Sequence, residues 1–144
     1  MESLDLSSYP PRGPRERLVG CMFLARTVDK LRAELPGGNL GAYVVDGPRT
    51  VSGYVLHKLG LNVDELRAVV GAALDEDEVV TWLRERTDPA LIAEVNGKLE
   101  NARIDGLTSE HYAFVAKRHP LLRDHPEIAT TFELLEADDA ATFA

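Results

Sequence analysis

The residues that could do chemistry gather in the first quarter of the chain. A segment rich in proline and arginine, residues 10–17, leads directly into apolar residues that recur at three- and four-residue steps. Arg12 and Arg15 stand where this pattern predicts the start of a helix, and the free N–H groups and the dipole of a helix start attract anions. The pattern predicts a phosphate or carboxylate site. The alternative is a strap that the prolines stiffen as it crosses the surface.

One carboxylate interrupts the apolar face of the predicted helix. At about 100° per residue, Asp29 falls inside the apolar arc, whereas Arg26 and Lys30 fall outside it. An isolated carboxylate against a core costs several kcal/mol, so we expect Asp29 to be paired or to lie in a cleft. Arg26 and Arg32 are each three residues from Asp29, and both can reach it along the helix.

Asp29 therefore has two interpretations. It is the centre of a structural Arg–Asp–Arg clamp, or it is the wall of a pocket whose arginines present donors to an anionic ligand. Asn96, beside Gly97 in another predicted helix, breaks the local helix preference and indicates a packed or polar contact. The candidate ligand-binding residues are Arg12, Arg15, Arg26, Asp29, Lys30, Arg32 and Asn96.

Other patterns give little indication of a site. The glycines of residues 37–41 follow a helix and do not join a strand to a helix, so they lack the context of a dinucleotide loop. The four histidines lack metal-ligand spacing, and the acidic run 75–78 suits a helix start better than a calcium loop. Cys21 is expected as a small core residue. We expect no metal and no cofactor, and we assign no catalytic residue.

Helix caps and stops divide the chain into about seven short helices. Their expected places are 14–35, 49–59, a helix capped by Asn62, one capped by Asp75, one opening at Pro89, one capped by Thr108 or Ser109, and one from Pro126. Residues 39–48 are expected as a loop and residues from 138 onward as a polar tail. Strand signals are almost absent, so the sequence predicts an all-α fold, a compact bundle. We expect one helical domain over 1–144, with a possible division into 1–87 and 88–144.

Composition limits the class of partner and the compartment. The net charge is −8. Residues 1–35 hold six basic and five acidic residues, or +1, which leaves −9 for the remainder. An acidic body argues against nucleic-acid binding, whereas the basic segment suits a small anion, an acidic protein or the chain's own acidic remainder. No apolar run approaches the ~18 residues of a membrane span, and the single cysteine fits a reducing compartment. We expect a cytoplasmic protein without membrane contact.

Several short motifs, taken together, resemble a known family. The chain is similar to the DUF5069 domain proteins, an uncharacterised bacterial family. The motifs are Pro11-Arg12, Pro14-Arg15-Glu16, Leu24-Ala25-Arg26, Val28-Asp29-Lys30, Leu59-Gly60-Leu61 and Thr131-Phe132-Glu133-Leu134-Leu135. Family members tend to carry tryptophan before the asparagine where this chain has Val95-Asn96, and residues 44–52 also depart. The resemblance implies a cytoplasmic helical protein and supplies no catalytic residues.

Three functions fit these observations. The first is a binding or regulatory module that holds a small anion or an acidic partner through Arg12, Arg15, Arg26 and Arg32. The second is an enzyme in which Asp29 acts as acid/base and the arginines orient an anionic substrate. The third is a structural homo-oligomer that pairs exposed apolar helix faces. Because the sequence shows no nucleophile–base pair and no metal set, we favour the first, and the oligomeric state stays open.

Overall fold

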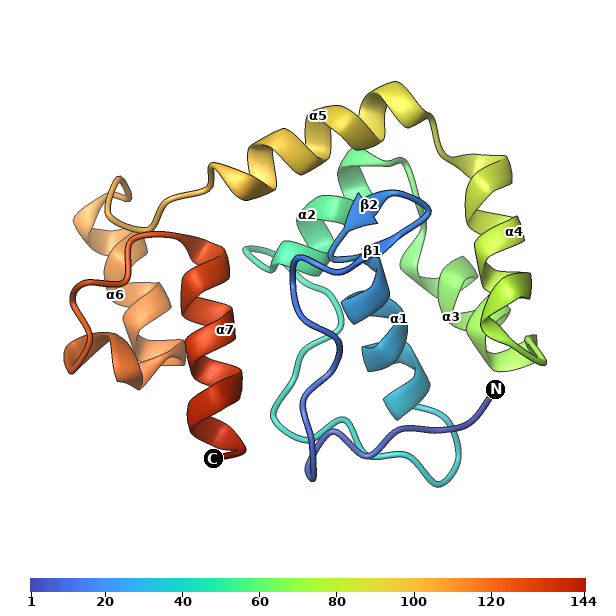
Figure 1. Cartoon of the computed structure of the whole chain (residues 1–144), viewed down its shortest axis with the longest axis horizontal. Coiled ribbons are helices and arrows are strands. Elements are labelled where there is room, and N and C mark those ends of the chain that lie inside the picture. The colour runs from blue at the N-terminus through green and yellow to red at the C-terminus, as the bar shows by residue number, and fades with distance from the viewer. The chain divides into compact units, whose positions relative to one another are not determined.

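The computed structural model describes residues 1–144 and divides them into two compact units, Met1–Asn96 and Gly97–Ala144 (Figure 1). The elements are, in order, β1 (Arg17–Leu18), β2 (Cys21–Met22), α1 (Leu24–Ala33), α2 (Val51–Lys58), α3 (Val63–Ala72), α4 (Glu76–Arg86), α5 (Pro89–Glu100), α6 (Ser109–Arg118), the 3₁₀ turn η1 (Pro120–Arg123) and α7 (Thr131–Thr142). The prediction of a helical fold with about seven helices is confirmed. No helix has both the length and the apolar character that a membrane span requires.

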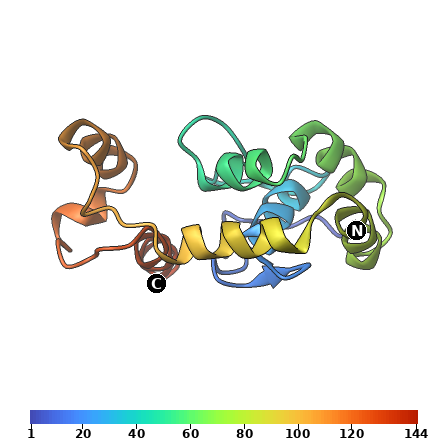
Figure 2. The ribbon, with the colours of Figure 1, turned by 90° about the horizontal axis from the view of Figure 1, so that it is seen from above.

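The boundary between the units falls inside a helix. α5 runs without a break through residues 96 and 97 (Figure 2). The possible division predicted from the sequence, at 87 and 88, lies just before this helix begins. α5 therefore contributes its first eight residues to the first unit and its last four to the second.

Capping residues set the helix starts that the sequence predicted. The side chain of Asn62 accepts hydrogen bonds from the backbone N–H groups of Asp64 and Glu65, and Asp75 accepts one from Glu78 at 3.1 Å. Such caps satisfy N–H groups that have no partner inside the helix. The sequence interpretation of α3 and α4 is therefore confirmed.

The first predicted helix begins ten residues too early. Residues 17–22 form an antiparallel hairpin instead, in which Leu18 pairs with Cys21, and α1 begins only at Leu24. Val19 and Gly20 both have positive φ, 49° and 78°, as in the type I′ turn that suits a hairpin's twist. Consecutive left-handed residues cannot lie inside a right-handed helix. The side chains of Leu18 and Cys21 therefore enter the core from two strands and not from one face of a helix.

The last predicted helix also begins elsewhere. Residues before Thr131 are held extended, because the N–H of Ile104 donates to the carbonyl of Ala129 at 2.8 Å and the N–H of Thr131 donates to Ala102 at 3.0 Å. α7 begins after Thr130, whose hydroxyl accepts from the N–H of Glu133 at 3.2 Å and donates to its carboxylate at 2.7 Å. Thr130 is therefore a side-chain N-cap, a stronger start than Pro126. The predicted polar tail is helical as far as Thr142.

Helix α1 is the centre of the first unit. Nine of its ten residues are buried, and it packs against α2, α3 and β1 (Figure 1). The second unit has a separate small core. It consists of Ile104, Leu122 and Leu134, with Tyr112, Val115, Leu121 and Ile128 among the side chains packed against them. Because α1 is enclosed, every polar side chain on it must find a partner or line a cavity.

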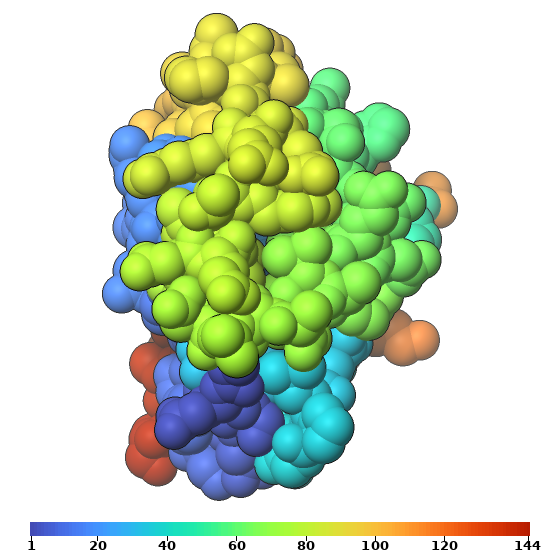
Figure 3. All heavy atoms as spheres, turned by 90° about the vertical axis from the view of Figure 1, so that its right-hand side faces the viewer, coloured from blue at the N-terminus to red at the C-terminus, as the bar shows by residue number.

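The N-terminal residues lie against the turn between α3 and α4. The amino group of Met1 donates to the carbonyl oxygen of Ala73 at 2.7 Å, and Figure 3 shows the first residues, in dark blue, below α3 and α4. Further along, the N–H of Leu6 donates to the carbonyl of Asn39 at 2.7 Å. These contacts bring the proline- and arginine-rich segment back over α1.

Candidate functional site

Asp29 accepts a cage of hydrogen bonds on one flank of α1. Its side chain is only 6% exposed. The backbone N–H of Arg12 donates to Oδ2 at 2.8 Å, Nη2 of Arg12 donates to Oδ1 at 2.9 Å, and Nε lies within 3.2 Å of both oxygens. Nη1 of Arg32 lies 3.9 Å from Oδ1. Asp29 is therefore buried and paired with arginine, as expected, although its main partner is Arg12.

The prolines around Arg12 explain how it reaches Asp29. Residues 10–17, the N-terminal strap, cross α1 with Pro11 and Pro14 buried. The peptide units of Arg12 are held from both sides, because its N–H donates to Asp29 and its carbonyl accepts from Nη1 of Arg26 at 3.2 Å. Arg26 was expected to pair with Asp29 along the helix. Arg26 instead donates to the backbone of the strap, and Arg12 is the arginine that pairs with Asp29.

A second carboxylate, that of Glu76, joins Arg12 and Asp29. We call these three residues the Arg12 node. Glu76, the first residue of α4, accepts from Nη1 of Arg12 at 3.3 Å and also from Nη2. Burial alone lowers the pKa of Arg12, but the hydrogen bonds of Glu76 and Asp29 outweigh it and raise the pKa above its ordinary value. Arg12 is therefore a permanent cation that joins the strap, α1 and α4. The sequence analysis missed Glu76 because it assigned the acidic run 75–78 to the first turn of a helix.

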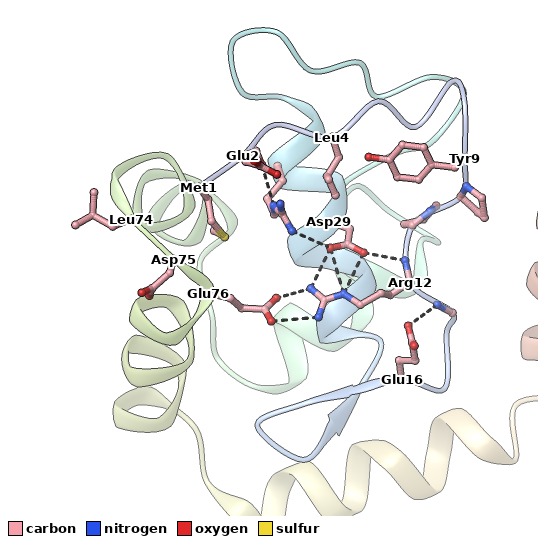
Figure 4. Close-up of a pocket in the computed structure, with 14 residues that line it drawn as sticks. Met1, Glu2, Leu4, Tyr9, Arg12, Glu16, Asp29, Leu74, Asp75 and Glu76 are labelled. Carbon is pink, nitrogen blue, oxygen red and sulfur yellow. Dashed lines mark hydrogen bonds and ion pairs between the residues drawn. The ribbon is translucent and has the colours of Figure 1, made fainter.

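An open hollow surrounds this node. It has a volume of about 840 Å³ and lies among the N-terminal residues, the strap, α1 and the start of α4 (Figure 4). Its charged side chains are five carboxylates and two guanidinium groups: Glu2, Glu16, Asp29, Asp75 and Glu76, with Arg12 and Arg32. We call it the N-terminal hollow. Arg12 and Arg32 thus lie in a predominantly negative environment.

Two cations lie on the neighbouring flank of α1. Arg26 and Lys30 are one helical turn apart and are only 2% and 7% exposed, although the helix wheel placed them outside the apolar arc. Both charges lie over the ring of Phe23, at 5.8 and 5.1 Å from its centre. Arg26 also lies 5.4 Å from the centre of the Tyr43 ring. We call Arg26 and Lys30 the basic pair.

Lys30 also reaches the start of α2. Its Nζ donates to Oγ of Ser52 at 3.1 Å, and Ser52 is the second residue of that helix. Thr50 caps the helix by accepting from the N–H of Gly53 at 3.1 Å. The ammonium group is therefore close to the positive end of the α2 dipole. Tyr43 and Ser52 carried no sequence signal, since a tyrosine in a loop and a serine in a first turn are both ordinary.

Asn96 makes the polar contact that its place in a helix indicated. Its Oδ1 accepts from the N–H of Met22 at 2.8 Å, and its Nδ2 donates to the carbonyl of Gly20 at 2.9 Å. These bonds hold the hairpin, and Asn96 does not line the N-terminal hollow. Arg15 is exposed on the strap. The structure thus gathers Arg12, Arg26, Asp29 and Arg32 around the strap, with Lys30 beside Arg26.

No group of three or more His, Cys, Asp or Glu side chains is arranged to hold a metal ion. Cys21 is buried in β2, and burial raises the pKa of its thiol to about 11, although Arg17 opposes the shift. A thiol with that pKa is protonated near neutral pH and is a poor nucleophile.

The model of the family described as "Domain of unknown function (DUF5069)" matches residues 8–141, nearly the whole chain. No curated protein matches the sequence. The matched range includes the strap, α1, the basic pair and the hairpin that Asn96 holds.

Proposed function

Because the chain belongs to the DUF5069 family, whose description names no activity, we propose a function from the geometry: a binding or regulatory module for a small anion or an acidic partner. The observation that carries the proposal is the basic pair. Arg26 and Lys30 place two positive charges one turn apart on a buried flank of α1. We place the anion-binding function on these two residues.

The clustering of like charge supports this assignment. Two cations four residues apart on a helix repel each other, and burial penalises each of them. The rings of Phe23 and Tyr43 and the hydroxyl of Ser52 lie against these two cations and help to hold their charged groups in place. A carboxylate or phosphate group beside Arg26 and Lys30 would be attracted by both charges and by the N-terminal end of α2.

Arg12 and Arg32 are less suited to hold an anion. Four of the five N–H groups of the Arg12 guanidinium point at Asp29 or Glu76. Nε of Arg32 donates to the carbonyl of Glu2 at 3.0 Å, and its Nη1 faces Asp29. An anion would have to displace carboxylates to reach these donors. We therefore propose that Arg12 and Arg32 position the strap.

The two alternatives have weaker support. An acid/base at Asp29 needs an oxygen that a substrate's proton can reach, whereas both oxygens already accept hydrogen bonds from Arg12. A homo-oligomer needs a contiguous apolar patch, and only Tyr9, Val44 and Leu74 are large exposed hydrophobic residues. For the setting we propose a bacterial cytoplasm, which the family resemblance implies and which a single buried thiol suits.

The test is a titration of the protein with phosphate, citrate, ATP and an oligoglutamate peptide, followed by thermal shift and by amide NMR. We expect at least one of these anions to raise the melting temperature and to move the amide resonances of residues near 26, 30 and 52. Lys30→Met should weaken that binding at least tenfold. If no anion changes the melting temperature or the resonances of the wild-type protein, the proposal is wrong.

A matched control is available on α2. Lys58 is exposed and its ammonium also lies over an aromatic ring, 6.0 Å from the centre of Tyr54. Lys58→Met removes the same charge from the chain and should leave anion binding within twofold of the wild type. An equal loss in Lys58→Met and Lys30→Met would show that net charge, and not the basic pair, determines the affinity.

A further inference from the structure

We propose that the N-terminal hollow binds a second, oppositely charged partner: an extended segment of another protein that carries basic and apolar side chains in alternation. The surface differs from the basic pair in position and in sign of charge. It lies over the strap and the start of α4, and its charged lining is mainly acidic (Figure 4). The inference therefore stands independently of the function proposed for Arg26 and Lys30.

Charge complementarity indicates a basic partner. Asp29 and Glu76 are compensated by Arg12, whereas the acidic residues nearer the rim are exposed. Glu16 accepts from the N–H of Gly13 at 3.0 Å and Asp75 accepts from the N–H of Glu78. A backbone amide carries no net charge, so these bonds leave the negative charge in place. Carboxylates of this kind attract lysine and arginine side chains and orient their approach.

Exposed apolar side chains indicate that the partner also carries apolar residues. Tyr9 and Leu74 are 44% and 83% exposed, and both line the N-terminal hollow. They are two of the three large exposed hydrophobic residues of the chain, and Val44, the third, does not line the hollow. Figure 4 shows Tyr9 and Leu74 on opposite sides of the node, with Asp29 and Arg12 between them. Two apolar side chains at the edges of one cavity offer separate contacts for the apolar side chains of a bound extended segment.

The shape favours a peptide over a small amine. A hollow of about 840 Å³ that is open to solvent accepts several side chains at once. Its two apolar edges lie on either side of the charge-compensated Arg12 node, and exposed carboxylates lie nearer its rim. An extended segment can place lysine or arginine side chains against the carboxylates of Glu2, Glu16 and Asp75, and apolar side chains on Tyr9 and Leu74. The chain's own basic segment, residues 12–17, already belongs to the strap that builds the hollow, so the occupant comes from another molecule.

The first measurement is the fluorescence anisotropy of labelled five-residue peptides titrated with the full chain. We expect saturable binding of Lys-Leu-Lys-Leu-Lys, at least tenfold weaker binding of Lys-Ser-Lys-Ser-Lys, and no binding of Glu-Leu-Glu-Leu-Glu. The affinity for the first peptide should fall as salt is raised from 50 to 300 mM. No saturable binding of the first peptide at millimolar protein, or equal binding of all three, would overturn the proposal.

Substitutions in the protein locate the surface. Leu74→Ser should weaken binding of the first peptide at least fivefold, whereas Val44→Ser, which removes an exposed apolar side chain outside the hollow, should not. The pair Glu2→Gln with Glu16→Gln should weaken it at least threefold. The pair Glu94→Gln with Glu110→Gln removes the same charge elsewhere and should leave it unchanged. Equal losses in test and control variants would show nonspecific association and contradict the assignment.

Two further readouts keep this proposal separate from the anion-binding function. Leu74 is almost fully exposed, so Leu74→Ser should leave the melting temperature of the free protein unchanged, and a lost affinity then reports binding. Lys30→Met should leave peptide affinity within twofold, because Lys30 does not line the hollow. Peptide binding that disappears with Lys30→Met would place the peptide on the basic pair and overturn the assignment to the N-terminal hollow.

Discussion

The two charged flanks of helix α1 are stabilised in different ways. On one flank Asp29 meets guanidinium groups and a backbone N–H, so opposite charges and directed hydrogen bonds compensate its burial. On the other flank Arg26 and Lys30 place like charges over the same aromatic ring. The charge-assisted hydrogen bonds of the first flank are those expected of a structural ion pair. A buried charge alone therefore does not indicate binding.

The largest effect is expected at Asp29. Asp29→Asn keeps the shape of the side chain but removes the counter-charge of Arg12 and Arg32 and turns one acceptor into a donor. Because the carboxylate is buried while Arg12 is partly exposed, we expect a loss of about 3 kcal/mol in the free energy of unfolding. A urea titration measures it. An unchanged midpoint with an unchanged slope would show that this flank is not structural.

Asn96 provides an uncharged reference for buried polar contacts. Asn96→Ala leaves the N–H of Met22 and the carbonyl of Gly20 without their partner, which should cost about 2 kcal/mol. Asn101→Ala is the control, since its side chain bonds only to the carbonyl of Gly97 on an exposed surface and should cost under about 0.5 kcal/mol. Equal stability of the two variants would mean that the hairpin does not depend on α5.

Lys30→Met tests the basic flank directly. Methionine keeps the packing of the stem on Phe23 and removes the cation together with its hydrogen bond to Ser52. The lost repulsion from Arg26 and the lost cost of burying the ammonium group offset that hydrogen bond. We expect the free energy of unfolding to change by less than about 1 kcal/mol in either direction. Chemical unfolding by urea is again the measurement. A loss as large as that of Asp29→Asn would remove the contrast between the flanks.

The smallest effect is expected at the rim of the node. Glu76→Gln removes a partly exposed carboxylate while Arg12 keeps all its bonds to Asp29. Exposed pairs contribute little, so we expect a loss of about 0.5 kcal/mol. The variant should be measured in 50 mM and 500 mM salt, where the difference from the wild type should shrink as the charges are screened. A loss of stability that persists at high salt would show that Glu76, like Asp29, stabilises the fold by a pair that solvent does not screen.

Local signals in the sequence predicted most helices correctly. Asn62 and Asp75 cap helices with side chains that act within three residues, so the cause of the helix start lies in the adjacent sequence. The burial of Asp29 also followed from periodicity alone. Its partner did not, because Arg12 arrives by a strap whose return over α1 depends on contacts with residues 39 and 73.

Longer-range effects explain the failures. Residues 18–22 have apolar spacing that suits a helix, yet the left-handed turn at Val19 and Gly20 and the hydrogen bonds from Asn96 make them a hairpin. A helix wheel assumes one buried face, so it placed Arg26 and Lys30 outside the apolar arc, whereas α1 is enclosed and both residues are buried. The elements that enclose α1, and Glu76 as the partner of Arg12, lie far along the chain. Patterns within one helical turn of Arg26, Lys30 or Arg12 therefore cannot reveal them.

The link between Asn96 and the hairpin also constrains the order of folding. Asn96 is 74 positions from Met22 and 76 positions from Gly20, the two residues to which it is hydrogen-bonded. Helix α1 begins directly after the hairpin that these bonds hold. Contacts of such separation form slowly, because the intervening chain must close before they contribute. During synthesis the two hydrogen bonds from Asn96 to the hairpin can form only after α5 has left the ribosome. The central helix of the first unit therefore acquires its fixed starting point from one of the last residues of that unit to be made.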